Sequence, residues 1–265
     1  MSLYESVQEG RIFLLKSDSL EKSFFEEAER IIHRSFGESP EEAEFRMTRQ
    51  EHFDRLQDAR QEMSSEGTVS LLEKFLNEIF PNDDLYYDIP RLRAVTTYGH
   101  TVPEARPAYF VHRDSWYGNP EVQINLWAAL SEITEKNCFA FYPEYFQKSV
   151  RNNSRKFDLK KWNENGGFQS SGKKIYPRAF FGLEKPKERL FTCSKYDVLI
   201  FSADHLHGTR PNLSGKTRFS ADIRVVLKRH SERNHFRGAK DNFSKGSMLS
   251  CMKYLKASEK TASSI

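Results

Sequence analysis

Residues 198–227 read VLIFSADHLHGTRPNLSGKTRFSADIRVVL, and this stretch decides the fold. An apolar run comes first, then a turn rich in proline, asparagine, serine and glycine, and then Arg218–Val225, in which polar and apolar residues alternate. An alternation with a period of two is typical of a strand with one buried face. The stretch therefore predicts two antiparallel strands joined through a turn.

Similar runs, rich in β-branched and aromatic residues and separated by turn residues, occupy much of the chain upstream of this stretch. They are residues 92–98, 108–112, 122–130, 138–142 and 189–193. Short strands that follow one another in this way are typical of an antiparallel barrel or jelly roll. We therefore expect a mainly β fold with flanking helices.

The first third of the chain predicts those helices. Apolar residues recur at spacings of three and four within Ser19–Phe36, and Gly37 is a suitable end. Ser39 and Pro40 predict the start of a second helix that runs to about Ser64, and Val69–Phe80 predicts a third. Each helix has a single apolar stripe and must therefore pack on another layer.

These patterns divide the chain into three parts. We expect an N-terminal helical layer at residues 1–88, a catalytic β core at 89–227 with a polar insertion at about 147–187, and a basic, partly disordered tail at 228–265 with a short helix at 248–255. Residues 1–88 hold 10 basic and 21 acidic residues, whereas the remainder holds 31 and 16. This asymmetry suits an acidic layer packed on a basic body, and it equally suits an anionic ligand.

Composition limits the class of protein. The 265 residues are 38% hydrophobic and 13% aromatic, which is enough to fill a core. The sequence shows neither an apolar run long enough for a membrane span nor a signal-peptide pattern, so we expect a cytoplasmic protein. The three cysteines contain no CxxC pair, and no nucleic-acid-binding motif accompanies the basic residues. The sequence does not indicate an oligomeric state.

Three residues are candidate metal ligands. His112 and Asp114 are two apart at the end of an expected strand, so both side chains point to the same face. His207 follows the apolar run 198–202, and Arg218 returns beside it across the turn. Two histidines and one carboxylate form the facial set that holds non-haem Fe(II), and an arginine can grip a carboxylate through two hydrogen bonds.

Two neighbouring residues compete for these roles. His205 shares a strand face with His207, and we favour His207 as the ligand because of its spacing to the turn and to Arg218. His205 is then a hydrogen-bonded core histidine or a support for the ligands. Arg224 lies on the same face as Arg218 and is the alternative carboxylate clamp.

Taken together, these motifs resemble the iron(II)/2-oxoglutarate-dependent oxygenases, and among them the phytanoyl-CoA dioxygenase-like branch. The resemblance rests on His112-x-Asp114, on His207-Gly-Thr-Arg-Pro-Asn-Leu-Ser and on Arg218, and it includes the strand Ile124-Asn-Leu-Trp127. It covers about residues 92–227. It implies a double-stranded β-helix core of the jelly-roll, cupin-like type.

The resemblance also implies a chemistry. His112, Asp114 and His207 would bind Fe(II), while Arg218 and Thr209 would hold the distal carboxylate of 2-oxoglutarate close to Trp127. With O2 as the second cosubstrate, such an enzyme hydroxylates, or otherwise oxidises, a C–H bond of a small molecule and releases succinate. An aspartate at position 114 favours hydroxylation over halogenation. The substrate class includes natural-product intermediates, sugars and acyl derivatives, and the basic insertion raises the alternative that the substrate is anionic.

Other functions remain as alternatives. His112-Arg-Asp114 with Asn119 also spells HRDxxxxN, the catalytic-loop motif of protein kinases, but the sequence contains neither DFG nor a glycine-rich loop upstream. A jelly-roll binding or scaffold protein without catalysis is a second alternative. A metal-dependent dioxygenase that uses no 2-oxo acid is a third, and Arg218 and Thr209 argue against it.

Overall fold

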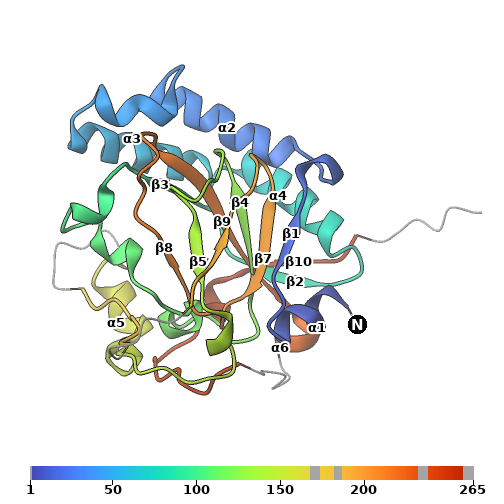
Figure 1. Ribbon diagram of the computed structural model, residues 1–265. Coiled ribbons are helices and arrows are strands. Elements are labelled where there is room, and N and C mark those ends of the chain that lie inside the picture. Colours follow the sequence, from blue (N-terminus) through green and yellow to red (C-terminus); the bar gives the residue numbers. More distant parts are fainter. Residues whose placement is uncertain (1, 168–173, 182–186, 232–237, 259–265) are drawn as a thin grey trace, which may run out of the picture.

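The computed structural model in Figure 1 describes residues 2–167, 174–181, 187–231 and 238–258. The helices are α1 Leu3–Gln8, α2 Ser23–Phe36, α3 Arg49–Glu62, α4 Glu66–Ile79, α5 Leu159–Glu164 and α6 Lys228–Ser231. The strands are β1 Phe13–Leu15, β2 Leu85–Tyr87, β3 Arg91–Val95, β4 Ile124–Ala129, β5 Phe139–Phe141, β6 Arg189–Phe191, β7 Val198–Ser202, β8 His207–Thr209, β9 Arg218–Leu227 and β10 Lys253–Leu255. Within the described ranges, no helix has both the length and the apolar composition that crossing a bilayer requires.

The strands form two antiparallel sheets. The larger sheet has the order β1-β7-β4-β9-β2-β10. Strand β3 also pairs with β9, along the same side of β9 as β2. Both fit because β9 is 10 residues long: β3 pairs with residues 218–222 and β2 with residues 225–227. The smaller sheet has the order β6-β5-β8. A mainly antiparallel β architecture with helices is consistent with the expected jelly roll.

Helices α2, α3 and α4 pack on one face of the larger sheet, as Figure 1 shows. Phe24 and Phe25 of α2 and Phe75 of α4 are fully buried in one cluster with Leu126 of β4 and Ile223 of β9. Full burial of such a side chain contributes about 1.5–3 kcal/mol. The apolar stripe of these helices therefore finds its partner on the sheet.

The opposite face of the larger sheet packs against the smaller sheet. Along β4, Leu126 and Ala128 belong to the cluster beneath the helices, whereas Trp127 and Ala129 belong to a second cluster between the sheets. There they meet Phe139 and Phe141 of β5. Because successive side chains of a strand point to opposite faces, β4 contributes to both hydrophobic clusters. The cluster between the two sheets surrounds the candidate site.

Two expected elements in the first half of the chain differ from the structure. The second helix is wrong as a continuous element: Pro40–Phe45 forms a 3-10 helix and α3 starts only after Thr48. Thr48 and Glu51 cap each other's backbone N–H groups, so this second start signal prevails. The strand at 108–112 is also wrong, because Arg106–Tyr109 forms a 3-10 helix with Pro107 in its first turn.

The C-terminal segment is more ordered than expected where the structure describes it. The helix expected at 248–255 is wrong: Met248–Cys251 is a 3-10 helix, and β10 completes the edge of β2. Ala239 and Asp241 are buried. The rest of the expected disorder falls on residues 232–237 and 259–265, which lie outside the described residues, and parts of the insertion, 168–173 and 182–186, do so as well.

Candidate metal centre

The two histidines of the centre come from segments that are adjacent in space. His112 and His207 form an isolated antiparallel bridge, in which each backbone N–H donates to the other residue's carbonyl, at 2.9 and 3.0 Å. The ring centroids lie 4.6 Å apart. The expected pairing of His207 with the strand of Arg218 is wrong, because His207 lies in β8, which pairs with β5, whereas β9 belongs to the other sheet, where β4 separates it from β7. The bridge with His112 brings together two side chains that are far apart along the chain.

Backbone carbonyl groups orient both imidazole rings. Nδ1 of His112 lies 2.8 Å from the carbonyl oxygen of Phe110, and Nδ1 of His207 lies 2.8 Å from that of His205. A carbonyl only accepts, so each Nδ1 carries a hydrogen, and in the neutral ring Nε2 then has the lone pair. Histidines that bind a metal are commonly held in this way, with the second nitrogen donating to a carbonyl.

Asp114 completes the group. Its Oδ1 lies 3.4 Å from Nε2 of His112, and its Oδ2 accepts a hydrogen bond of 2.7 Å from the side-chain amide of Asn125. Asn125 is in turn held by the amide of Gln123. Burial on its own raises the pKa of Asp114, but the adjacent imidazoles of His112 and His207 and the charge of Arg224 hold it far below its ordinary value. The carboxylate is therefore ionised across the physiological range.

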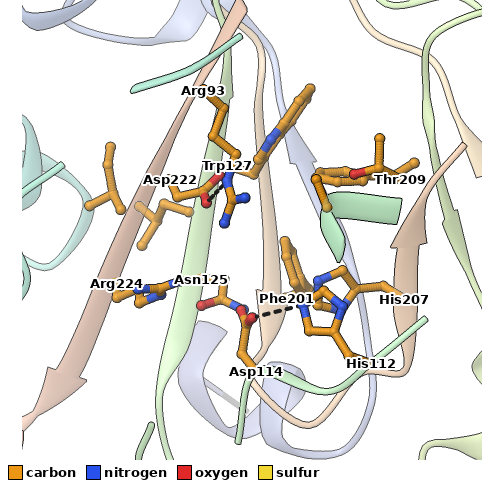
Figure 2. Close-up of a pocket in the computed structure, with 14 residues that line it drawn as sticks. Arg93, His112, Asp114, Asn125, Trp127, Phe201, His207, Thr209, Asp222 and Arg224 are labelled. Atoms are coloured by element: carbon orange, nitrogen blue, oxygen red, sulfur yellow. Dashed lines mark hydrogen bonds and ion pairs between the residues drawn. The ribbon is translucent and has the colours of Figure 1, made fainter. Parts of the chain in front are cut away.

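One ligand atom from each of His112, Asp114 and His207 lies within 4.8 Å of the other two. Figure 2 shows the three side chains turned toward one another at one end of a pocket between the sheets. Burial, and secondarily the charge of His112, lowers the pKa of His207 to about 4, so its imidazole is neutral at pH 7. Two imidazoles with oriented Nε2 atoms and an ionised carboxylate fit a divalent transition metal.

His205 has a different environment. Its Nδ1 accepts from the backbone N–H of Ser202 at 3.0 Å, and its Nε2 faces the carbonyl of Gly10 at 3.1 Å. Burial lowers its pKa to about 4. Both ring nitrogens are therefore engaged by backbone groups, and His205 lies outside the three-residue group.

The HRDxxxxN string has a structural explanation. Arg113 points away from the metal group and is fully buried, with ion pairs to Asp204 at 3.6 Å and to Asp241 at 3.2 Å. The side chain of Asn119 donates to the backbone carbonyl of Asp114. These residues fix the segment that carries two of the candidate ligands, His112 and Asp114.

Of the remaining predicted residues, two line the pocket and one, Arg218, is buried behind its wall. Trp127 and Thr209 line the pocket together with Arg93, Asp222 and Arg224. Arg218 does not line it; its guanidinium is fully buried beside the rings of Trp127 and Phe139, whose centroids lie 5.6 and 5.1 Å from Cζ.

Several donors near Arg218 have no acceptor. Its Nη1 donates to the carbonyl of Asn137 at 2.8 Å, but its Nε and Nη2 are buried without a partner, as is Nε1 of Trp127. Unsatisfied buried donors are rare in proteins. A carboxylate between the sheets would satisfy these donors, so the residues present fit a dicarboxylate cosubstrate beside the metal.

Sequence reasoning missed three contributions to the site. Asn125 could have been found, because it alternates with Trp127 on the inward face of an expected strand. Arg93 could have been found by the same alternation on β3. Asp241 had no local signal, since only the tertiary fold brings it to Arg113.

Comparisons with known proteins give a structural likeness alone. No protein-family model matches the chain, and no curated protein matches it. Among solved structures, the chain is similar to the non-heme monooxygenase ThoJ in its apo form, with 10% identity over 85% of this chain and 77% of that chain and a TM-score of 0.47.

Two further solved structures are similar. One is the epimerase SnoN in complex with Fe3+, alpha ketoglutarate and nogalamycin RO, with 11% identity over 84% of this chain and 83% of that chain and a TM-score of 0.43. The other is an oxidoreductase of the 2OG-Fe(II) oxygenase family from Burkholderia pseudomallei, with 13% identity over 68% of this chain and 62% of that chain and a TM-score of 0.35. With all three TM-scores below 0.5, the function has to be argued from the residues of this chain.

Proposed function

We propose that this protein is an Fe(II)- and 2-oxoglutarate-dependent oxygenase that hydroxylates, or otherwise oxidises, an unactivated C–H bond of a small molecule. The overall reaction consumes O2 and 2-oxoglutarate, releases CO2 and succinate, and oxidises the substrate. The observation that supports it is the group of two oriented imidazoles and one ionised carboxylate. Such a set occupies one face of a ferrous ion and leaves the other positions for cosubstrates.

In this proposal His112, Asp114 and His207 hold the iron, which supplies the oxidative chemistry with O2. The protein contributes the orientation of the ligands. The carbonyls of Phe110 and His205 fix the two rings, and Asn125 fixes the carboxylate. The fold is then a double-stranded β-helix with the helical layer outside it, and membership of the phytanoyl-CoA dioxygenase-like branch is part of the proposal.

Arg218 is proposed to hold the distal carboxylate of 2-oxoglutarate, with Thr209 and Trp127 beside it. Two of its donors and the indole N–H are buried without acceptors, which supports this role. The rings of Trp127 and Phe139 flank the guanidinium and keep water from it. A charged hydrogen bond is stronger in such a dry environment than at a surface.

The domain limits at residues 88 and 227 and a cytoplasmic location also remain proposals. Strands β1 and β2 lie before residue 88 and belong to the larger sheet, so the first segment contributes strands as well as helices.

Anaerobic titration tests the proposed function. Protein loaded with Fe(II) is titrated with 2-oxoglutarate, and the visible charge-transfer band of an iron-bound 2-oxo acid is recorded. We expect the band in the wild type and in the matched control Lys160→Ala, which changes an exposed residue of the insertion. Asp114→Ala should abolish it, and Arg218→Gln should shift the titration to higher 2-oxoglutarate concentration. A wild-type protein that binds Fe(II) but gives no band at any concentration would refute the proposal.

A further inference from the structure

Three arginines lie along the inward face of the larger sheet beside the metal group. Arg91 and Arg93 belong to β3 and Arg224 to β9, and alternation places all three on the face opposite Leu92, which packs beneath the helices. Arg93 forms an ion pair with Asp222, which lines the pocket with it (Figure 2). Arg91 and Arg224, in contrast, do not each have a carboxylate of their own.

Those two arginines share one carboxylate. Oδ2 of Asp88 lies 2.9 Å from Nη2 of Arg91 and 3.4 Å from Nη1 of Arg224. The other oxygen, Oδ1, accepts from the backbone N–H of Ile89 at 2.9 Å. One carboxylate therefore accepts from two guanidinium groups, and these are left with a deficit of hydrogen-bond acceptors.

Arg224 shows where the deficit lies. The residue is 7% exposed, and its Nε is buried without an acceptor. A buried guanidinium donor left without an acceptor costs free energy that an incoming anion would recover. The charge of Arg224, ahead of burial, lowers the pKa of Arg91 to about 10, as expected for two cations that lie close together.

The position of Arg224 ties this deficit to the metal centre. It lines the same pocket as His112 and Asp114. It also pairs in register with Asn125, the residue that holds Asp114. Arg218 is six residues away along β9, roughly 20 Å of extended strand, so the cosubstrate clamp and this pair of arginines are separate.

We propose that Arg91 and Arg224 form an oxyanion subsite that binds a carboxylate or phosphate group of the substrate and places the rest of the molecule against the metal centre. The subsite rests on the proposed function for its role in catalysis, but it binds an anion whether or not iron is present. The substrate class is thereby a small molecule with one such group. Arg91, which is 35% exposed at its side chain, forms the solvent side of the subsite.

The test uses metal-free full-length protein and two probes, inorganic phosphate and acetate. Each probe is titrated at constant ionic strength, and its dissociation constant is obtained from ligand-observed NMR. Arg224→Gln should weaken the tighter probe at least about tenfold, because it removes a charged hydrogen bond. Asp88→Asn should tighten binding several-fold, because it removes the competing carboxylate. The tighter of the two probes identifies the anionic group of the substrate.

Two controls make the result decisive. Lys160→Gln removes one positive charge from an exposed position and should leave the dissociation constants unchanged. Arg218→Gln should weaken 2-oxoglutarate binding in the Fe(II)-loaded protein, whereas the part of phosphate or acetate binding that depends on Arg224 should persist in it. Circular dichroism establishes that each variant is folded. Because Asp88→Asn should tighten probe binding whereas Arg224→Gln should weaken it, the test stays valid where Arg224→Gln is unstable.

The outcomes separate this subsite from the proposed function. Equal affinity in the wild type and Arg224→Gln, or unchanged affinity in Asp88→Asn, would overturn the subsite even where the 2-oxoglutarate band forms normally. Loss of phosphate or acetate binding in Arg218→Gln alone would overturn it too, since the probe would then occupy the cosubstrate position. Arg224-dependent binding in a protein that gives no 2-oxoglutarate band would support the subsite and refute the oxygenase.

Discussion

Replacement of Asp241 by asparagine should destabilise the whole protein, although the residue lies in the C-terminal segment. Asp241 is 2% exposed. Its carboxylate pairs with Nε of Arg113 at 3.2 Å and accepts from the indole N–H of Trp116 at 3.0 Å and the backbone N–H of Val150 at 2.9 Å. Asparagine keeps the shape of the side chain but removes its charge, so Arg113 loses one of its two counterions.

The structure sets the magnitude of this effect. Removal of one partner from a buried ion pair costs about 3–5 kcal/mol. The second counterion, Asp204, is a weaker partner because burial raises its pKa to about 7, so the carboxyl is partly protonated at neutral pH. The negative charge of Asp241 contributes to that rise. Without it Asp204 ionises more readily and recovers part of the loss, so we expect about 3 kcal/mol, the lower end of that range.

Urea and thermal unfolding followed by circular dichroism measure the effect. For a chain of this length about 3 kcal/mol corresponds to a decrease of roughly 6–12 °C in Tm. Asp58→Asn is the matched control, because Asp58 is exposed on α3, and it should change Tm by less than about 2 °C. A Tm for Asp241→Asn equal to that of the wild type would show that Arg113 does not depend on this carboxylate.

Three further predictions concern the centre itself. Asn125→Ala should lower Fe(II) affinity roughly 10–100-fold, because Asp114 loses the amide that orients it; anaerobic calorimetry measures this, and an unchanged affinity would contradict it. His207→Ala should abolish Fe(II) binding in the same assay while His205→Ala retains it, and the reverse result would mean that the ligand is misassigned. In metal-free protein His205 should lower the stability as pH decreases from about 6.5 to about 4, because burial lowers its pKa to about 4 and the unfolded chain binds the proton first. Its contribution is a loss of about 2 kcal/mol at pH 5. The urea midpoint of the wild type, measured relative to that of His205→Gln, should therefore be lower at pH 5 than at pH 7, and parallel profiles would exclude this origin.

The sequence sufficed to choose the three residues that the structure brings together. The choice rested on local spacing, since His112 and Asp114 are two residues apart and His207 precedes the turn before Arg218. The strand pairing expected from that spacing is wrong, because Asp114 begins a 3-10 helix and His207 pairs with His112 and with Phe141 of β5. Spacing of this kind is a local signal. The main helices could be predicted for the same reason, since their apolar stripes and caps lie within a few residues of one another.

The features that were missed depend on distant partners. Strands β1, β2 and β10 are three residues long, too short for a periodic signal, and they exist because an edge of the sheet accepts them. The pairing of Asp241 with Arg113 joins residues 128 positions apart. The split of the second helix was misread for another reason: the sequence offers two start signals, and only packing chooses between them.

The ion pair between Arg113 and Asp241 affects the order of events during synthesis. A chain still emerging from the ribosome has already exposed His112, Asp114 and His207 before residue 241 leaves the exit tunnel. Until then Arg113 lacks the carboxylate of Asp241, so fewer contacts hold the segment that carries His112 and Asp114. This segment therefore reaches its final packing only after residue 241 has folded onto it.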